Sequence, residues 1–495
     1  MFKQRLPLLI LLTIYVVYSL LSFKSFGITN DEPEDYLLGS FLYTKLRADD
    51  PVLERSFVIA ADGAINLAMY DRIYMALQYA IAGEINYDTY HLLNLLFFSI
   101  ILIAAYELLL KETGRTSLAT IGPIALFLTP RLFGDIAANH KDVPFAISYF
   151  VSLVAIYLFG NKNSAKYLLI LGLFFGLTQS LRTVGYSIYL VYVLWLLFNR
   201  ATLVSFKKIF EILAQVAVIF FIGLLIHFVT LPYLAADPFS RFAELLTNAK
   251  AFPWNNAVLY FGTQFLSTEL PWHYVPIWFL ITTPILFLVY GLLSVKLISK
   301  SKLARLLWLS LFVNSVLLVL SQPVLYDGVR HLLFLLPPFV LLACLSFFAL
   351  LKSKWRWKKI ALSLTALNVV LILVQYSLLF PFHYIYFNEV IGYLPGANNR
   401  FELDYWGASY KSAVEQFNQR AQFEKTYQLY FCGDPQQVKA YARFKYELVY
   451  EINNADLLIC HRRGNNQTTI DTFDSKNQFA IKRLGVPLTT VKWTP

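Results

Sequence analysis

The sequence predicts an all-α polytopic membrane protein with about eleven transmembrane helices, followed by a small soluble α/β domain. Of its 495 residues 57% are hydrophobic and only 15% are charged, with a mean hydropathy of +0.54. Apolar runs of about 20 residues recur as far as residue 380. Lys and Arg collect in the short connectors between these runs, which is typical of cytoplasmic loops. This placement of the net charge of +11 argues against a nucleic-acid-binding protein.

The basic connectors set the expected topology. Lys3 and Arg5 precede the first run and place the N-terminus in the cytoplasm, and every later basic loop then falls on the cytoplasmic side. The last run delivers the polar tail to the outer side. The expected spans cover about residues 6–23, 91–110, 118–129, 145–159, 167–179, 186–198, 209–231 and 275–295, a ninth ending near Ser321, a tenth ending near Leu351, and 360–380.

Two regions lie outside the spans on the outer side. The first outer loop, residues 24–90, is rich in Asp and Glu, and residues 62–85 alternate apolar and polar residues at near-helical spacing. This pattern predicts amphipathic helices at the membrane interface. Residues 381–495 form the soluble domain, with strands expected near residues 426–431, 447–450 and 455–460 and a helix near 436–443.

Four carboxylates follow the first span within five residues: Asp31, Glu32, Glu34 and Asp35. A carboxylate at the water–membrane boundary can deprotonate an acceptor hydroxyl, especially where partial burial raises its pKa. The alternative is ordinary solvation of a helix end, or pairing with a distant arginine. We expect Asp31 and Glu32 to be the functional pair, and Glu34 and Asp35 to be solvated residues at a helix start.

Further ionisable residues near the spans also fall on the outer side. Arg182 has no acid near it in sequence and lies between two apolar runs, so it is suited to a lipid phosphate. Interfacial anchoring is the alternative for each such cation. The candidate phosphate-binding residues are Arg131, His140, Lys141, Arg182, Arg330 and His331.

A second set of residues is suited to binding the rest of a substrate. His91 and Asn94 are one helical turn apart and share a face, from which they could orient the Asp31 region. Aromatic residues of the loop before residue 275 could stack on a sugar or, alternatively, form an interfacial belt. The candidate substrate-binding residues are His91, Asp135, Asp142, Trp272, His273, Tyr326 and Asp327.

The ordered motifs resemble those of the GT-C membrane glycosyltransferases, in particular the protein-O-mannosyltransferase and aminoarabinose-transferase group and a bacterial subgroup of it. The resemblance covers about residues 30–410. It is carried by the Asp31–Glu32 pair and by the segments Pro130-Arg131-Leu132-Phe133-Gly134-Asp135, Asn139-His140-Lys141-Asp142-Val143-Pro144-Phe145, Leu270-Pro271-Trp272-His273-Tyr274, Tyr326-Asp327-Gly328-Val329-Arg330-His331, Tyr386-Phe387-Asn388-Glu389 and Phe401-Glu402-Leu403-Asp404-Tyr405-Trp406-Gly407.

The resemblance implies a sugar donor linked to a polyprenyl phosphate, and an acceptor hydroxyl on a glycan, lipid or protein. Asp31 matches the catalytic acidic residue of the family and would act as general base, with Glu32 as its neighbour in the catalytic pair. Direct displacement would invert the anomeric centre. The tail does not resemble the β-trefoil domain of the protein mannosyltransferases. The expected location is a bacterial inner membrane, with the C-terminal domain periplasmic.

Three further expectations bear on the alternatives. No cofactor is required for this chemistry, although the carboxylates leave room for a divalent cation such as Mg²⁺ or Mn²⁺. A structural metal is not expected, because no Cys/His pair has zinc-like spacing. A transporter of a lipid-linked or anionic solute is the alternative function, and a non-catalytic scaffold is a third. Cys344 is expected to be a core residue, whereas Cys432 and Cys460 could form a disulfide that the sequence does not establish.

Overall fold

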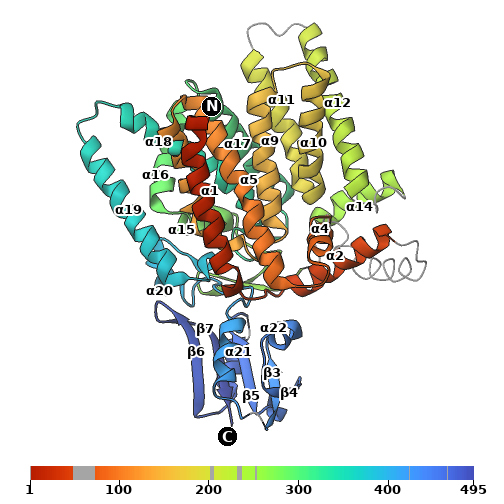
Figure 1. Cartoon of the computed structure of the whole chain (residues 1–495), viewed down its shortest axis with the longest axis vertical. Coiled ribbons are helices and arrows are strands. Elements are labelled where there is room, and N and C mark those ends of the chain that lie inside the picture. The colour runs from red at the N-terminus through yellow and green to blue at the C-terminus, as the bar shows by residue number, and fades with distance from the viewer. Residues whose placement is uncertain are drawn as a thin grey trace.

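The protein consists of a helical bundle with a small sheet-containing unit at one end (Figure 1). The computed structural model describes residues 2–47, 73–200, 206–230, 237–250, 254–422, 424–464 and 466–494. The N-terminus of α1 lies at the end of the bundle opposite the sheet. The short helices α2 (Glu32–Arg47) and α4 (Ile73–Ala82) lie at the end that faces the sheet.

Within the described ranges, seven helices are long and apolar enough to cross a membrane. They coincide with seven of the predicted spans, because each is a continuous apolar run without an internal break. These helices are α1 (Phe2–Ser22), α5 (Tyr87–Thr113), α9 (Asp142–Phe159), α12 (Phe206–Thr230), α17 (Lys302–Ser321), α18 (Leu336–Lys352) with the turn η4 (Arg330–Leu335) before it, and α19 (Lys358–Leu379).

Three predicted spans fall on apolar helices of 10–17 residues. The total of eleven crossings therefore remains a prediction. These shorter helices pack inside the bundle, where Leu171 and Phe175 of one and Val191 and Leu196 of another are fully buried. The segments are α6 (Thr116–Ala119) with α7 (Ile121–Phe127), α10 (Ala165–Leu181), and η2 (Thr183–Tyr186) with α11 (Ser187–Arg200).

The outermost helices expose long apolar faces. Ile14 on α1, Phe221 on α12 and Leu364 on α19 are each about 60% exposed, and each is one of a series of exposed apolar residues on its helix. Surfaces of this kind are unfavourable in water and favourable against lipid tails. The chain is accordingly a multi-pass membrane protein.

The predicted eighth span is not one straight helix. It is divided into α15 (Tyr274–Thr282) and α16 (Ile285–Leu293), which are bent by 115° around Pro284. Proline cannot donate the backbone hydrogen bond that would continue the helix. Asn388 compensates, because its side-chain amide donates to the carbonyls of Leu280 and Thr283 at 2.6 Å each. The predicted span is thus broken at Pro284, and Asn388 explains part of the Tyr386–Glu389 motif.

The first outer loop carries the predicted helices only in part. Helix α4 falls inside the predicted amphipathic stretch, whose residues 62–72 lie outside the described residues. Helix α2 begins directly at the acidic pair, with Glu32 in its first turn. Acidic residues at this position interact favourably with the helix dipole.

The C-terminal unit contains a five-stranded mixed sheet of order β4-β3-β5-β7-β6. Strands β4, β3 and β5 run parallel to one another. Strand β7 runs antiparallel to both of its neighbours, β5 and β6. The predicted α/β class is confirmed, although the last two strands were not predicted. Its elements are α21 (Tyr410–Asn418), β3 (Thr426–Phe431), α22 (Pro435–Lys439), β4 (Lys445–Leu448), η7 (Ile452–Asn454), β5 (Leu457–His461), α23 (Asn466–Thr472), β6 (Asn477–Arg483) and β7 (Val486–Trp493).

One hydrophobic core joins the bundle to the sheet. It includes Trp278 of α15, Phe401 of the connecting segment, and Leu429 and Val491 of the sheet, all of which are buried. The sheet unit is therefore packed into the end of the bundle rather than tethered to it. A disulfide joins Cys432 to Cys460 within the sheet unit, whereas Cys344 is a buried free thiol in α18.

The remaining short elements connect these parts. They are η1 (Phe23–Ser25), α8 (Pro130–Asp135), α14 (Pro238–Lys250), β1 (Ala257–Tyr260), β2 (Thr263–Leu266), η3 (Ser294–Leu297), η5 (His383–Ile385), η6 (Glu389–Ile391) and α20 (Tyr393–Ala397).

Candidate active site

Three segments that are far apart in sequence meet around Asp31. Asp31 lies immediately before α2, Lys141 immediately before α9, and Arg330 at the start of η4. The Asp31 Oδ2 atom lies 2.9 Å from Arg330 Nη1 and 3.2 Å from Lys141 Nζ. The Asp31 side chain is 29% exposed and that of Lys141 is 16% exposed, whereas Arg330 is buried at 4%. A ligand that approaches this cluster therefore meets Asp31 and Lys141 first.

The electrostatics of Asp31 differ from the sequence-based expectation. Burial opposes ionisation of the carboxyl, but the charges of Lys141 and Arg330 outweigh it and hold the pKa of Asp31 well below its ordinary value. A pKa raised by partial burial is not what the structure gives, because two cations that are distant in sequence lie beside the carboxyl. Asp31 is ionised in this arrangement, and both of its cationic partners can also bind an anion.

Asp35 belongs to the cluster rather than to the solvated surface. Its Oδ2 lies 2.7 Å from both Lys141 Nζ and His140 Nε2, and its side chain is 3% exposed. The expectation that it would be a solvated helix-start residue was wrong, whereas Glu34 is exposed as expected. Asp35 is one turn along α2 from Asp31, so both carboxylates face Lys141.

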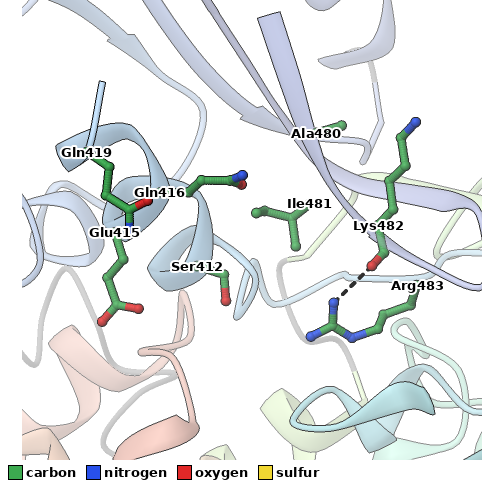
Figure 2. Close-up of a pocket in the computed structure, with 8 residues that line it drawn as sticks. All are labelled: Ser412, Glu415, Gln416, Gln419, Ala480, Ile481, Lys482 and Arg483. Carbon is green, nitrogen blue, oxygen red and sulfur yellow. Dashed lines mark hydrogen bonds between the residues drawn. The ribbon is translucent and has the colours of Figure 1, made fainter. Parts of the chain in front are cut away.

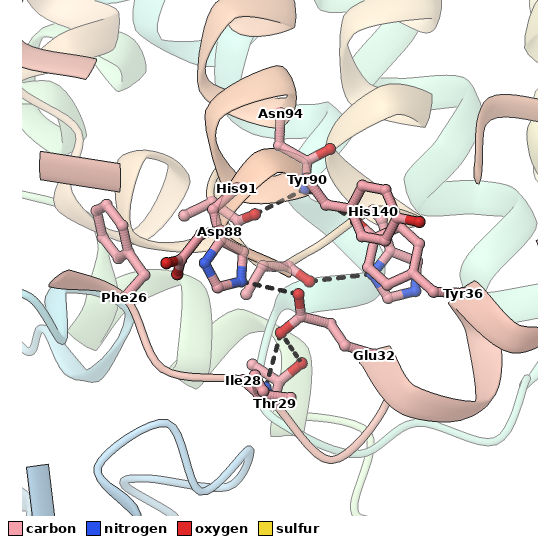
Figure 3. Close-up of polar contacts among 12 residues, drawn as sticks. Phe26, Ile28, Thr29, Glu32, Tyr36, Asp88, Tyr90, His91, Asn94 and His140 are labelled. Atoms are coloured by element: carbon pink, nitrogen blue, oxygen red, sulfur yellow. Dashed lines mark hydrogen bonds and ion pairs between the residues drawn. The ribbon is translucent and has the colours of Figure 1, made fainter. Parts of the chain in front are cut away.

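Glu32 takes part in a polar network with Thr29 and His91 (Figure 3). Its Oε2 accepts hydrogen bonds from the backbone N–H of Thr29 at 2.7 Å and from the Thr29 hydroxyl at 3.0 Å. Its Oε1 lies 2.8 Å from His91 Nε2, and both side chains are fully buried. Both Glu32 oxygens are thus engaged, and the arrangement anchors the start of α2 to α5.

Asn94 lies one turn beyond His91 on the same face of α5 and extends this anchor. Its side-chain amide donates to the Ala137 carbonyl at 2.7 Å, and its Oδ1 accepts from Gln78 and from Tyr74 at 2.8 Å each. The first outer loop is therefore tied to α5 and to the segment that follows α8. This rigid frame fixes the position of the neighbouring Asp31.

Asp327 holds the other side of Arg330. Arg330 Nε lies 3.3 Å from Asp327 Oδ2, while the rings of Tyr326 and Trp406 lie 4.8 and 5.5 Å from the guanidinium carbon. Arg330 Nε also donates to His331 Nε2 at 3.3 Å. The cation is thus fixed by a carboxylate and two aromatic faces, and its Nη1 points to Asp31.

The motif around residue 140 is shaped by Asn139. Its Oδ1 accepts from the backbone N–H of Asp142 at 2.8 Å and of Lys141 at 3.3 Å, which turns the chain into α9. His140 and Lys141 then face Asp35, while Asp142 pairs with Arg182. Arg182 has no acid near it in sequence, but the fold brings Asp142 to it.

Arg131 and Asp135 both lie on α8, outside this cluster, and both side chains are buried. Within the described residues the guanidinium of Arg131 forms no hydrogen bond, and it lies 5.4 Å from the Trp278 ring and 5.5 Å from the Tyr405 ring. Burial, opposed by the charge of Arg131 and reinforced by that of Asp142, raises the pKa of Asp135 to about 7. Arg131 is 1% exposed, so a phosphate does not reach it in this conformation.

Gly134 explains the glycine of the Pro130–Asp135 motif. A Cβ atom at this position would lie 2.0 Å from the backbone nitrogen of Tyr384. Helix α8 therefore packs directly against the backbone of η5, and a side chain would separate them. Gly328 has φ +68°, a conformation that favours glycine, and a Cβ atom there would lie 2.8 Å from Arg131 Nη2.

Trp272 and His273 have no contact with the Asp31 cluster among the described residues. Trp272 is 87% exposed, and its ring packs against that of His273. The His273 ring lies 2.6 Å from the Tyr260 hydroxyl. Their predicted substrate role stays a prediction.

Sequence reasoning missed the residues that the sheet unit contributes. Arg463, in the loop after β5, lies 2.5 Å from Asp327 Oδ1 and 3.5 Å from Glu402 Oε1. Gln437 and Tyr441 contact the backbone of Ile28, three residues before Asp31. No motif marks them, because they occur in the part of the tail without recognisable resemblance.

Metal-binding clusters and surface grooves are two other kinds of site that a protein of this kind could use. In the described part of the chain, no group of three or more His, Cys, Asp or Glu side chains is placed to hold a metal ion. A groove of about 450 Å³ lies between α21 and β6 (Figure 2). It is lined mainly by polar side chains such as Glu415, Gln419 and Lys482, and it shares no residue with the Asp31 cluster.

Comparison with known proteins identifies the fold. The crystal structure of ArnT from Cupriavidus metallidurans bound to undecaprenyl phosphate superposes over 98% of this chain and 97% of its own, with a TM-score of 0.53 and 10% sequence identity. This chain has the GT-C fold. The GT-C fold that the sequence motifs predicted is therefore confirmed. The apo structure of the same ArnT matches over 86% of this chain and 88% of its own, at 11% identity and a TM-score of 0.45.

Neither a protein-family model nor a curated protein sequence matches the chain. The GT-C fold is thus shared with a solved structure at an identity too low to transfer individual residues. The function of the Asp31 cluster depends on the geometry of its own side chains.

Proposed function

We propose that the chain is a membrane glycosyltransferase that moves a sugar from a polyprenyl-phosphate donor to an acceptor hydroxyl. The observation that carries the proposal is the partly exposed Asp31 carboxylate between Lys141 and Arg330, in a GT-C fold. The ArnT structure of the same fold holds undecaprenyl phosphate. That lipid combines an anionic group with a long apolar chain. The anionic group could bind cations at the end of the bundle while the apolar chain lies against its apolar helices.

The donor phosphate would bind Lys141 and Arg330. An ammonium and a guanidinium both donate charge-assisted hydrogen bonds to phosphate oxygens, and these bonds are stronger than neutral ones. In the present arrangement Asp31 forms ion pairs with both of these cations. A phosphate would compete with Asp31 for these hydrogen bonds, and Asp31 would become more basic as it lost them.

The transfer step would be a single displacement. The acceptor oxygen attacks the anomeric carbon while the bond from that carbon to the phosphate oxygen breaks, and the bonding electron pair leaves with the phosphate. The acceptor proton moves to the Asp31 carboxylate. Lys141 and Arg330 stabilise the charge that develops on the departing phosphate, and the anomeric centre is inverted. These steps balance without a cofactor. Measuring transfer activity with and without EDTA would test whether the reaction needs a divalent cation.

The other members of the cluster would support this step. Asp35 pairs with Lys141 and is itself held by His140, and the Glu32–His91 pair fixes the start of α2. The pairing of Arg182 with Asp142 favours a supporting role over direct phosphate binding. Arg131 would reach a phosphate only after a rearrangement, because it is buried.

The proposed location is the outer face of a bacterial inner membrane. The N-terminus would be cytoplasmic and the sheet unit periplasmic, which agrees with the basic inner loops and with a disulfide in the sheet unit. The acceptor would be a glycan, a lipid or a protein hydroxyl in the cell envelope.

The test is transfer from an undecaprenyl-phosphate-linked sugar in membranes that contain the protein. Mass spectrometry of lipids and envelope polymers from a strain that lacks the gene, with and without the gene restored, would identify the missing sugar. Release of undecaprenyl phosphate from that donor by the wild type, and its loss in Asp31→Asn at equal protein abundance, would support the proposal. Uptake of the lipid-linked sugar into proteoliposomes without transfer would favour a transporter instead.

A further inference from the structure

The loop after strand β5 carries Arg463 into the cluster around Arg330. Its Nη2 lies 2.5 Å from Asp327 Oδ1, and its Nη1 donates to the Tyr405 carbonyl at 2.8 Å. Its Nε lies 3.5 Å from Glu402 Oε1. Three nitrogen atoms of one guanidinium are thus engaged by groups of the bundle end. The side chain is 22% exposed, so Arg463 closes the cluster on the side of the sheet.

Asp327 connects Arg463 to Arg330. Its Oδ1 faces Arg463 and its Oδ2 faces Arg330 Nε at 3.3 Å, so one carboxylate lies between two guanidinium groups. Arg330 in turn places Nη1 2.9 Å from Asp31. The contacts form one continuous series: Arg463, Asp327, Arg330 and Asp31.

The backbone at Asp327 depends on such contacts. Asp327 has φ +57° and Gly328 has φ +68°, so two successive residues adopt the left-handed conformation. This conformation is unfavourable for a residue with a Cβ atom, and it persists where surrounding contacts hold it. The Gly328 backbone N–H donates to the Tyr274 hydroxyl at 3.0 Å, and Arg463 holds the Asp327 side chain.

The same sheet unit also holds the chain that leads to Asp31. The Gln437 side-chain amide donates to the Ile28 carbonyl at 2.7 Å, and the Ile28 backbone N–H donates to the Tyr441 hydroxyl at 3.0 Å. The Lys411 ammonium donates to the Phe26 carbonyl at 3.2 Å. The sheet unit thus contacts both sides of the Asp31–Arg330 pair.

The disulfide joins the two parts of the sheet unit that make these contacts. Cys432 follows β3 and lies five residues before Gln437, and Cys460 lies on β5 three residues before Arg463. The Cys432 backbone N–H also donates to the Ile459 carbonyl at 3.2 Å. The bond fixes the loop that holds Ile28 relative to the loop that holds Asp327.

We propose that Arg463 is a positioning residue for glycosyl transfer, which acts through Asp327 to aim Arg330 at the donor phosphate and at Asp31. This inference rests on the proposed function. It makes the sheet unit a part of the active site, since Arg463 belongs to that unit and the donor-binding cation belongs to the bundle.

The test compares Arg463→Ala and Arg463→Lys with Arg462→Ala, all in the full-length protein in nanodiscs. Arg462 is the adjacent, exposed arginine, so its variant removes the same charge without touching Asp327. We expect Arg463→Ala to weaken undecaprenyl phosphate binding and to lower kcat by about 10- to 100-fold, on the scale of a charge-assisted hydrogen bond. Arg463→Lys should recover part of both, and Arg462→Ala should match the wild type.

The pH profile separates positioning from a purely structural role. Burial raises the pKa of Asp327, and the charges of Arg463 and Arg330 oppose that shift. Without Arg463 this pKa rises further, so Asp327 loses its charge, and its hold on Arg330, at a higher pH. The acid limb of the rate profile should therefore move to higher pH in Arg463→Ala. A loss of folded protein alone would lower the rate without moving that limb.

The double variant supplies the decisive control. In the Asp327→Asn background, Arg463→Ala should have little further effect on kcat, because the residue through which it acts is already changed. An equal effect in both backgrounds, an unshifted pH profile, or wild-type behaviour of Arg463→Ala would overturn the inference. If the wild type itself transfers no sugar, the proposed function fails instead. Undecaprenyl phosphate binding by the same variants then still tests whether Arg463 aims Arg330.

Discussion

Lys141→Met should weaken binding of undecaprenyl phosphate while leaving the protein folded. Methionine keeps much of the length of the side chain and removes the charge. Lys141 Nζ contacts Asp31 at 3.2 Å and Asp35 at 2.7 Å. In the variant Asp31 still pairs with Arg330, and Asp35 still pairs with His140 at 2.7 Å. Neither carboxylate is left without a partner, so the stability loss should stay near 1 kcal/mol, well below the cost of breaking a buried pair outright.

The expected effect on binding follows from the lost phosphate contact. A hydrogen bond to a charged group contributes about 1.5–3 kcal/mol, and each 1.4 kcal/mol corresponds to a tenfold change, so Kd should rise by about 10- to 150-fold. Titration of undecaprenyl phosphate into protein in nanodiscs measures this change. Removing Lys141 should also raise the pKa of Asp31, because Lys141 is the strongest of the charges that lower it.

The matched control is Lys24→Met. Lys24 is an exposed lysine after the same first span, so its variant tests general attraction of an anionic lipid to a basic surface. It should bind undecaprenyl phosphate as the wild type does. Equal Kd values for Lys141→Met and the wild type would refute the assignment of Lys141 to the phosphate, as would an equal loss in both variants.

Three further predictions concern the frame of the site. Burial raises the pKa of Asp135 to about 7, so the folded protein retains a proton that the unfolded chain releases above about pH 4. The free energy of unfolding therefore falls as pH rises from about 4 to 7. Asp135→Asn should raise the free energy of unfolding at pH 8 by up to about 4 kcal/mol, and raise Tm with it. At pH 4 the variant should have no such effect. Gly134→Ala should lower stability by about 1–3 kcal/mol, because its Cβ would lie 2.0 Å from the Tyr384 nitrogen. Asn388→Ala should cost about 2–5 kcal/mol, because the Leu280 and Thr283 carbonyls, the second of them buried, both lose a donor.

Thermal unfolding in detergent checks all three. A Tm difference for Asp135→Asn that does not vary with pH would contradict its assigned protonation. Gly392→Ala is a comparison for Gly134→Ala: its φ of +82° strains the backbone, but a Cβ there meets nothing closer than 3.7 Å. If Gly134→Ala were the better tolerated of the two, the close packing of α8 against η5 would not be the reason for the glycine. Wild-type stability of Asn388→Ala would show that other groups satisfy those carbonyls.

Hydropathy and charge placement predicted much of the bundle. Long apolar runs such as that of α18 become helices whatever their neighbours, because a membrane requires internal backbone hydrogen bonds. The break between α15 and α16 was missed, although Pro284 within the run was a signal for it. The compensating donor, Asn388, lies about 100 residues further along the chain, so local sequence gives no indication of it.

The sequence indicated which residues belong to the candidate site better than it indicated how their charges interact. Asp31, Lys141 and Arg330 were all candidates, because each lies next to an apolar span on the outer side. Asp31 and Arg330 are 299 positions apart, and the two cations lower the pKa of Asp31, which burial alone would raise. Asp35 was predicted to be a solvated residue because its partner His140 is 105 residues away in the sequence. Arg463 was missed since a loop arginine in a polar tail has no periodicity or motif to mark it.

A structure of the full-length protein with undecaprenyl phosphate bound would test the central claim most directly. The account predicts phosphate oxygens within about 2.7–2.9 Å of Lys141 Nζ and of Arg330, the range for charge-assisted hydrogen bonds. It also predicts that the Asp31 carboxylate has moved away from at least one of these two cations. A phosphate bound elsewhere, for example in the groove beside Glu415, with Asp31 still paired to both Lys141 and Arg330, would contradict it.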